Sequence, residues 1–421
     1  FLTLVDDTAV HLINDDLLIV QQLFSNSPRS ASIDNQGDLW LADYGRGLVT
    51  NEGGGSWTIK PNGPYSTSVA DIESSGGVVH AVVGAITASW NNLWKTATLE
   101  TLRDEEWSWT HSWSDRDLIE LAIDPGDPSH VYAGSWGSGI LEYNGKEIAQ
   151  YNENNSSLQN LIPGQPYIRV GGVALDPQGN LWMTNTGVAE PISVLKADGS
   201  WKSFRADNLI SEYNALGDIL VSGAGNKWVI VPRGNGLFAM DDNMTIDDTS
   251  DDIYEKVSVV DKFGKIITND VYSFAEDLDG NLWLGTNQGV LVMYSPYRLF
   301  TDGSIYAQEI LIPRKDGSGY ADPLLGTQVV TSIEVDGANR KWLGTRGGGA
   351  YLVSEDGLEE LEHFTQNNSP LLSDVIMDIE VDGTSGEVFI GTDKGIISYK
   401  GDALQGATSY NNVVVYPNPV R

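Results

Sequence analysis

The sequence contains no cysteine among its 421 residues. Disulfide bonds, thiolate zinc sites and cysteine nucleophiles are therefore excluded. Histidine is scarce as well, and no pair has the His-Glu-x-x-His spacing or another paired spacing suited to zinc. The five histidines are His11, His80, His111, His130 and His363. Zinc chemistry of the common kinds is therefore not indicated.

Basic residues are few: 25 lysines and arginines face 58 aspartates and glutamates, which gives a net charge of −33. A nucleic-acid-binding protein needs a basic stripe to displace counterions, and docking on an anionic membrane needs basic clusters too. Both classes are disfavoured. Such a charge suits solubility in a salty or extracellular setting.

Long hydrophobic runs are also missing, since no stretch approaches the ~18 apolar residues of a membrane-spanning helix. The most apolar stretch, residues 78–90, is shorter and contains His80. Residue 1 is phenylalanine, and the first residues already have strand character. We expect the chain to begin inside a larger protein or after a cleaved segment.

Glycine and aromatic residues are abundant, with 46 Gly, 13 Trp and 17 Tyr. Hydrophobic residues make up 41% of the chain, which is enough for a large globular core. No long helical pattern accompanies them. This composition favours short strands joined by tight turns.

A repeated motif is clearest at residues 277–290, which read Asp-Leu-Asp-Gly-Asn-Leu-Trp-Leu-Gly-Thr-Asn-Gln-Gly-Val. Good copies cover 34–48, 176–185, 336–348 and 382–396, and weaker ones complete the series. The aromatic anchors of the eight units are Trp40, His80, Tyr132, Trp182, Trp228, Trp283, Trp342 and Phe389. A recurrence at roughly 40–50 residues is typical of propeller blades. A β-solenoid is the alternative, although its repeats are usually shorter.

Each unit predicts a β-hairpin. The Asp and Asn side chains bond the local backbone, and the Gly adopts a positive φ without steric cost. The Trp that follows is expected to wedge between neighbouring sheets. We therefore predict an all-β fold, a β-propeller of four-stranded antiparallel blades. Seven blades are favoured, although eight repeat units are visible.

The expected domains are the end of a preceding blade (1–25), the propeller (26–405), and a linker with the start of another domain (410–421). The last unit, anchored at Phe389, has two possible places. It could join the N-terminal strands to close an eight-bladed ring, or it could close a neighbouring propeller. A ring closed by both chain ends would leave no free sheet edge.

The motif resembles the two-component regulator propeller repeat, which is common in sensor ectodomains and surface proteins of Bacteroidetes. The tail, residues 413–420, reads Val-Val-Val-Tyr-Pro-Asn-Pro-Val and resembles the opening of the C-terminal sorting domain of type IX secretion cargo. A strand that ends in a proline-rich linker is the alternative for the tail. Together, propeller and tail resemble the PorZ-like family of the type IX secretion attachment complex.

This resemblance implies a non-catalytic binding or scaffold protein on the cell surface of a Gram-negative bacterium, associated with the outer membrane. It implies binding to anionic lipopolysaccharide, with a PorU-like sortase and a PorV-like outer-membrane protein as partners. No direct membrane span and no nucleic-acid partner are expected. None of the family's binding residues can be mapped onto this sequence, because no motif carries them.

The search for catalytic motifs is negative. The sequence contains no Gly-x-Ser-x-Gly elbow and no Walker loop, so we expect no enzyme activity and no cofactor. Carboxylates are plentiful, and sequence alone does not separate a glycosidase pair from turn residues. His80 occupies an anchor position and is expected to pack in the core. The acidic stretch 241–252 is either a solvated loop or a calcium site. Its candidate calcium ligands are Asp241, Asp247 and Asp251.

Five tryptophans fall within 24 residues of the second unit, more than one blade needs for packing. They are Trp90, Trp94, Trp107, Trp109 and Trp113. The alternation from 107 to 113 places three of them on one face of a strand. They could pack against the next blade, or they could form a surface that binds a glycan or a protein partner. His111, Arg103 and Arg116 would then add polar contacts to an anionic glycan.

Two other functions remain open at this stage. The chain could be the periplasmic propeller of a hybrid two-component system that senses oligosaccharides. It could also be secreted cargo, a glycan-binding or lyase-like propeller attached to the surface by its tail.

Overall fold

A computed structural model describes residues 2–406, apart from positions 26, 45, 60–61, 85, 207–208, 211–213 and 315. The chain divides into two compact units, Phe1–Gly63 and Pro64–Arg421, which we treat separately. The tail motif at 413–420 lies outside the described residues, so the expected linker and sorting-domain start stay predictions. Among the described residues, no helix is long and apolar enough to cross a membrane.

The first unit consists of two antiparallel sheets. Buried apolar side chains from both sheets form its core, among them Val10, Leu39 and Leu41. The first sheet contains β1 (Leu2–Val5), β2 (Ala9–Ile13) and β3 (Ile19–Phe24), and the second contains β4 (Pro28–Ile33), β5 (Leu39–Asp43), β6 (Gly47–Thr50) and β7 (Trp57–Ile59).

The described part of the second unit contains seven successive groups of antiparallel strands, here called blades 1 to 7. Blades 2 and 3 are joined into one eight-stranded sheet, because Trp136 and Gly137 pair with Arg169 and Ile168. Six have four strands and blade 7 has three. Blade 1 is β8 (Asp71–Ser75), β9 (Val78–Val83), β10 (Thr96–Arg103) and β11 (Glu106–Arg116); blade 2 is β12 (Leu118–Ile123), β13 (His130–Gly137), β14 (Gly139–Asn144) and β15 (Glu147–Tyr151); blade 3 is β16 (Ile168–Leu175), β17 (Leu181–Asn185), β18 (Ile192–Leu195) and β19 (Trp201–Phe204); blade 4 is β20 (Ile219–Val221), β21 (Lys227–Ile230), β22 (Leu237–Asp241) and β23 (Ile253–Val257).

Blade 5 follows with the best copy of the repeat, and a short helix and a hairpin separate it from blade 6. Blade 5 is β24 (Val271–Glu276), β25 (Leu282–Thr286), β26 (Gly289–Met293) and β27 (Gln308–Glu309); the helix is α1 (Arg298–Asp302) and the hairpin is β28 (Leu311–Pro313) with β29 (Ala321–Pro323); blade 6 is β30 (Val330–Val335), β31 (Lys341–Thr345), β32 (Ala350–Val353) and β33 (Glu360–Phe364); blade 7 is β34 (Ile376–Asp382), β35 (Glu387–Thr392) and β36 (Gly395–Lys400).

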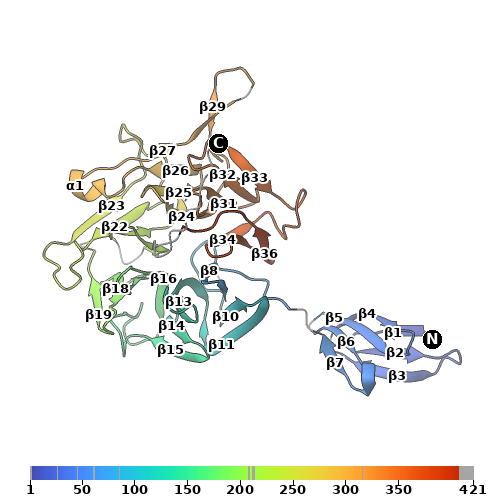
Figure 1. The fold of residues 1–421 in the computed structure, drawn as a ribbon. Coiled ribbons are helices and arrows are strands. Elements are labelled where there is room, and N and C mark those ends of the chain that lie inside the picture. The colour runs from blue at the N-terminus through green and yellow to red at the C-terminus, as the bar shows by residue number, and fades with distance from the viewer. Residues whose placement is uncertain are drawn as a thin grey trace, which may run out of the picture. The chain divides into compact units, whose positions relative to one another are not determined.

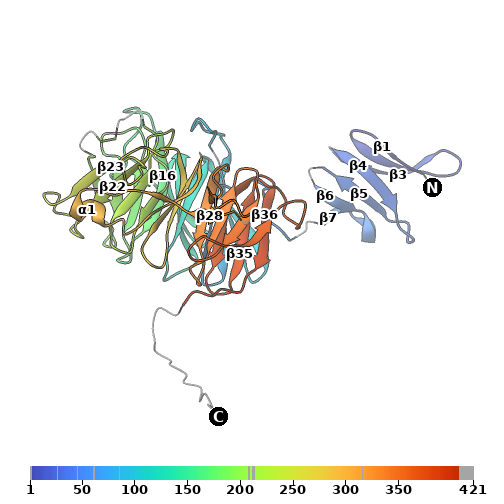
Figure 2. The ribbon, with the colours of Figure 1, turned by 90° about the horizontal axis from the view of Figure 1, so that it is seen from above.

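The blades of this unit are arranged around a common centre (Figure 1), and the view turned by 90° shows several of them side by side (Figure 2). The first strand of blade 1, β8, contacts the first strands of both blade 2 and blade 7, which closes the ring. The predicted all-β propeller of antiparallel, mostly four-stranded blades is confirmed.

Hydrogen bonds from side chains to the backbone join consecutive blades near the centre. Asp71 of blade 1 accepts the Leu121 amide of blade 2 at 2.7 Å. Asp378 of blade 7 accepts the Ile72 amide of blade 1 at 2.9 Å, and the Ile379 amide donates to Ser332 of blade 6 at 3.0 Å. Because these bonds satisfy amides that face the neighbouring blade, ring closure needs no strand shared between the two chain ends.

The division of the chain differs from the expected one. The sheet that carries Trp40 lies in the first unit with β1 to β3, so the boundary falls after Gly63 and not after residue 25. The last unit, anchored at Phe389, packs in the ring beside blade 1, where Phe389 contacts Val69 and Ile72. The sequence pattern shows each repeat unit but not the sheet that it packs against. Every copy of the motif presents the same kind of aromatic side chain, here called the wedge, to the space between two sheets.

The turn of the repeat is built as predicted. In blade 5, the two carboxylate oxygens of Asp277 accept the Asn281 amide at 2.8 Å and the Trp283 indole N–H at 2.8 Å. Gly280 lies between them with φ 74°. One aspartate thus fixes the turn and orients the wedge. The same Asp–Trp bond occurs at Asp34–Trp40 and Asp176–Trp182, both at 2.9 Å.

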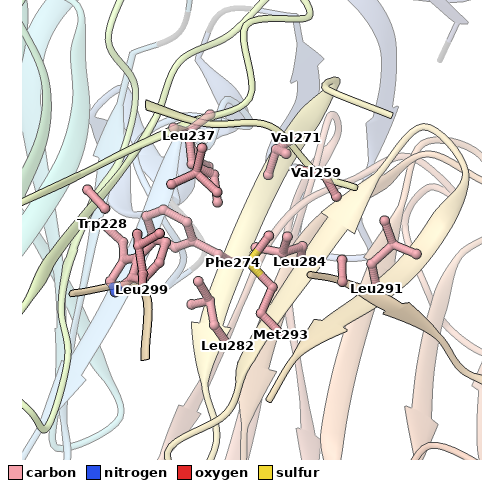
Figure 3. Close-up of a cluster of buried hydrophobic side chains, with 14 residues drawn as sticks. Trp228, Leu237, Val259, Val271, Phe274, Leu282, Leu284, Leu291, Met293 and Leu299 are labelled. Atoms are coloured by element: carbon pink, nitrogen blue, oxygen red, sulfur yellow. The ribbon is translucent and has the colours of Figure 1, made fainter. Parts of the chain in front are cut away.

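The core lies between neighbouring blades. Figure 3 shows one such cluster, in which Trp228 and Leu237 of blade 4 pack with Phe274 and Leu284 of blade 5. His80 holds the anchor position of blade 1, buried and bonded to Thr101 Oγ1 at 2.9 Å. Burial lowers its pKa, so a neutral ring is favoured in the core.

Candidate functional site

The structure separates the five clustered tryptophans of blade 1 into two groups. Trp90 and Trp94 lie in the loop between β9 and β10, and Trp107, Trp109 and Trp113 lie on the outermost strand, β11. The Trp113 end of β11 lies beside the end of this loop, because Thr96 at the start of β10 pairs with Arg116. Trp107 lies towards the opposite end of β11, where it pairs with Leu102.

The outer strand carries a continuous row of aromatic rings. Tyr65, which precedes β8, lies 5.5 Å from Trp109 and 4.6 Å from His111, and His111 lies 5.1 Å from Trp113. We call these four residues the rim row. Three of them are exposed: Trp113 by 71%, Tyr65 by 54% and Trp109 by 40%. The predicted alternative, packing of these tryptophans against the next blade, therefore does not describe Trp109 and Trp113.

Tyr65 had no signal in the sequence. It lies more than forty residues before Trp109, outside the repeat, and a buried carboxylate brings it there. Glu100 of β10 accepts the Ser66 amide at 2.7 Å. Glu100 is also the strand partner of Trp109. Burial raises the pKa of Glu100 to about 7.

A bulge sets the position of Trp113. Ala97 pairs with Ser112, but Thr96 pairs with Arg116, so three residues of β11 are inserted between these pairs. Such an insertion redirects the side chains of the bulged strand. The Arg116 guanidinium donates to the Trp113 carbonyl at 2.7 Å, which holds the bulge closed. Of the two arginines proposed for glycan contacts, Arg116 therefore has a structural role, and Arg103 lies at the opposite end of β10.

The loop that carries Trp90 and Trp94 is fixed by one buried carboxylate. Asp117 accepts the backbone amides of Trp94 and Lys95, each at 2.8 Å, and the Asn92 side-chain amide at 3.1 Å. Trp90 and Trp94 both have φ 60°, a left-handed conformation that is a genuine outlier for a bulky residue. Local packing and these bonds hold a strained loop that the repeat does not require.

Trp90 and Trp94 have different environments. Trp90 packs edge-on against the buried Trp136 at 5.2 Å, and the Trp136 indole N–H donates to the Trp90 carbonyl at 3.1 Å. Trp94 is 65% exposed, with its ring 6.4 Å from that of Tyr167. The Arg169 guanidinium lies 5.1 Å from the Tyr167 ring. We call Trp94, Tyr167 and Arg169 the loop face.

Two short segments beside blade 1 carry no acidic side chain, as do several other stretches of the chain. Residues 64–70 and 86–95 contain no aspartate or glutamate, although the chain carries 58. These segments bear Tyr65 and Trp94. An anionic ligand would meet less repulsion here than at the aspartate-rich turns.

The calcium candidates are each engaged in separate contacts. Asp247 pairs with Lys196 at 3.1 Å, and Asp251 accepts Thr245 Oγ1 at 3.1 Å. Asp241 accepts the Asn243 amide at 2.9 Å. Within the described residues, no group of three or more His, Asp or Glu side chains is arranged to hold a metal ion. The acidic stretch is better described as a loop between β22 and β23.

The fold defines a β-propeller, and one of its repeats matches a known family model. The family model of the two component regulator propeller matches residues 265–288, which include the turn of blade 5. No protein of curated function matches the sequence.

Among solved structures, the chain is similar to PorZ, described as an essential bacterial surface component of the type IX secretion system of Porphyromonas gingivalis. The identity is 26% and the TM-score 0.82, over 99% of this chain and 58% of that protein. This chain therefore spans little more than half the length of PorZ. The resemblance to the PorZ-like family, expected from the repeats and the tail, is confirmed.

More distant structures also align with this chain. A virginiamycin B lyase from Staphylococcus aureus aligns at 13% identity and TM-score 0.52, over 80% of this chain and 94% of that one. The extracellular domain of the hybrid two component system protein BT3049 from B. thetaiotaomicron aligns at 20% identity and TM-score 0.42, over 94% and 48%. At 13% identity, the likeness to the lyase concerns the fold alone.

Proposed function

We propose that this chain is the propeller part of a cell-surface component of the type IX secretion system that binds and does not catalyse. The observation that carries the proposal is the match to PorZ over nearly the whole chain. The working role is to bind anionic lipopolysaccharide and to assist a PorU-like sortase and a PorV-like outer-membrane protein in anchoring cargo.

We assign the glycan contact to the end of blade 1, through the rim row and the loop face. Trp113, Trp94 and Trp109 expose ring faces on which the C–H faces of sugar rings can stack, and aromatic side chains contribute much of the energy of such contacts. Arg169 is the nearby donor for a phosphate or carboxylate of the glycan. No other described part of blade 1 combines exposed aromatic rings with segments free of acidic residues.

The turn carboxylates of the repeat are poor candidates for a glycosidase pair, because they are engaged in the structure. Asp277 and Asp176 each bond a turn amide and an indole. An active-site carboxylate pair would need free oxygens facing a substrate cleft.

The binding assignment is tested with the double variant Trp94→Ala/Trp113→Ala and purified anionic lipopolysaccharide. We expect at least a tenfold loss of affinity by surface plasmon resonance, with an unchanged circular dichroism spectrum. Phe263→Ala is the matched control, because Phe263 is an exposed aromatic residue far along the chain. Equal affinity of wild type and double variant would remove the glycan contact from blade 1.

The secretion role is tested by genetics in the parent bacterium. Deletion of the gene should leave other type IX cargo unanchored, and complementation with the full-length protein should restore anchoring. If deletion leaves the export and anchoring of other proteins intact, the protein is cargo or a sensor and the proposed role is wrong. The binding assay and the genetic assay can fail independently.

A further inference from the structure

A cavity of about 290 Å³ lies at the centre of the ring, beside the loop that carries Trp90. Residues from six of the seven blades line it, so it is built by closure of the ring and not by any single blade. It is distinct from the glycan surface proposed above, because neither Trp94 nor any residue of the rim row belongs to its lining.

The walls of the cavity are mostly apolar and aromatic. Trp90 covers one side, held by Trp136 and lying close to Gly217, where a Cβ would approach its ring to 3.0 Å. Tyr272 and Met377 line it as well. Such walls accept the apolar body of a ligand.

Asp270 lines the cavity together with two further carboxyl groups, those of Glu120 and Asp218. The latter two are hydrogen-bonded to each other. Burial raises the pKa of Glu120 well above its usual value and that of Asp218 to about 6. The other acidic groups that act on Glu120 from neighbouring strands are Asp71, Glu73 and Asp378.

The charge of the cavity selects the sign of a ligand. Glu120, Asp218 and Asp270 oppose a single base, Arg233, whose side chain is exposed. A cation between the two bonded carboxyls would let both ionise and would relieve their repulsion. The described residues form no cluster suited to a metal ion, whereas an aromatic wall beside carboxylates suits an organic cation.

We propose that the central cavity binds an organic cation with an apolar stem, the chemistry of an arginine or lysine side chain. The stem packs against Trp90 and Tyr272, and the charged head reaches Glu120 and Asp218. The cation comes either from a free small molecule or from a side chain that a protein partner inserts, and the two sources are separated by the probes below.

The test is isothermal titration calorimetry of the full chain with Nα-acetyl-L-arginine amide, which mimics an arginine within a peptide. The matched probe is Nα-acetyl-L-citrulline amide, which has nearly the same shape without the charge. We expect the arginine probe to bind at least tenfold more tightly than the citrulline probe. Free L-arginine distinguishes the sources: it should bind more weakly if a peptide is the natural ligand, because its carboxylate would approach Asp270, and at least as tightly if a free cation is.

Three variants locate the binding. Glu120→Gln and Asp218→Asn keep the shape of the side chains and should each weaken the arginine probe at least tenfold. Glu153→Gln, an exposed control, should not change it. Trp90→Phe leaves the carboxyl groups intact and shortens the aromatic wall, so it should weaken the binding of both probes. Melting temperatures confirm that each variant is folded.

Three results would overturn the proposal. The first is equal affinity for the charged and uncharged probes, and the second is affinity for the arginine probe that is unchanged in both carboxyl variants. The third is binding of a sugar phosphate such as glucose 6-phosphate that Trp90→Phe abolishes, because this would show an anion site in the same cavity.

Discussion

Blade 5 and blade 1 are built from the same four-stranded plan and differ in what their special residues do. In blade 5, Asp277, Gly280 and Trp283 match the repeat, and each is used for the turn or the wedge. In blade 1 the anchor is His80, and five tryptophans lie outside the repeat pattern. In this comparison the motif residues serve the turn and the packing between blades, and the proposed binding surface lies where the motif breaks down.

In two regular blades, a lysine of the next blade lies over the wedge tryptophan. Lys341 of blade 6 lies 4.4 Å from the Trp283 ring and 3.5 Å from the Asp277 carboxylate. Lys227 of blade 4 lies 3.9 Å from the Trp182 ring of blade 3 and pairs with the buried Asp242 at 2.6 Å. The wedge of a regular blade is thus covered by its neighbour and offers no surface to a ligand.

The largest expected effect is the loss of a wedge in the regular blade. Trp283→Ala should destabilise the propeller by about 3–5 kcal/mol, because it removes a buried aromatic side chain and leaves a cavity. Chemical denaturation measures the change. Trp113→Ala, the same substitution in the rim row of blade 1, should change the stability by less than about 0.5 kcal/mol. Similar losses for both would erase the distinction between the blades.

The next effect concerns a buried ion pair. Lys227→Met should lower the free energy of unfolding of the propeller by up to about 5 kcal/mol, since it leaves the Asp242 carboxylate buried without its lysine. Lys146→Met, at an exposed lysine, is the control. A protein as stable as wild type by chemical denaturation would show that this pair, which lies within blade 4, contributes nothing to stability.

A smaller effect follows from the turn aspartate. Asp277→Ala should cost about 1–3 kcal/mol, because the Trp283 indole and the Asn281 amide lose a buried acceptor. Lipopolysaccharide binding should stay unchanged below the unfolding temperature. Reduced binding by a folded Asp277→Ala protein would place function in the regular blade, against the present account.

In blade 1 the expected effect depends on pH. The folded-state pKa of Glu100 is about 7, above its ordinary value of 4.5, so the folded protein binds more protons than the unfolded chain between these values. The contribution of Glu100 to stability is therefore fully present below pH 4.5 and is lost as the pH rises through 7.

Glu100→Gln isolates this contribution, because the amide oxygen can still accept the Ser66 amide. The melting temperature of the variant minus that of wild type should rise from pH 4.5 to pH 7.5. A difference that stays constant over this range would contradict the assignment of a buried, protonated Glu100 beneath the rim row.

The smallest expected effect on stability is that of Trp94→Ala. Its ring is largely exposed, and alanine keeps the same backbone conformation, so the change should be within about 0.5 kcal/mol. A large loss of stability would mean that Trp94 serves the loop and not a ligand. Differential scanning fluorimetry is sufficient for this measurement.

Much of the fold was predictable, because the turn and the wedge are encoded locally. The Asp-x-x-Gly-Asn turn and the Trp that follows it lie within seven residues, so one copy specifies one hairpin. The sequence did not predict which sheets the Trp40 and Phe389 units pack against, since packing between blades depends on side chains outside the motif, such as Ser332 and Asp378.

The candidate site was predictable only in part. The number of tryptophans between 90 and 113 marked blade 1, but the bulge before Arg116 and the left-handed backbone of Trp94 have no sequence signature. Tyr65 joins the row through the Glu100–Ser66 bond, a contact between residues more than thirty positions apart. The central cavity arises from ring closure and has no linear motif.

The account is tested most directly by measuring lipopolysaccharide affinity and melting temperature side by side for Trp94→Ala/Trp113→Ala and for Asp277→Ala. The two variants should show opposite effects. The blade 1 variant should lose affinity and keep its melting temperature, and the blade 5 variant should keep its affinity and have a lower melting temperature. Loss of affinity in both variants, or in the blade 5 variant alone, would contradict the separation of structure and binding between the two blades.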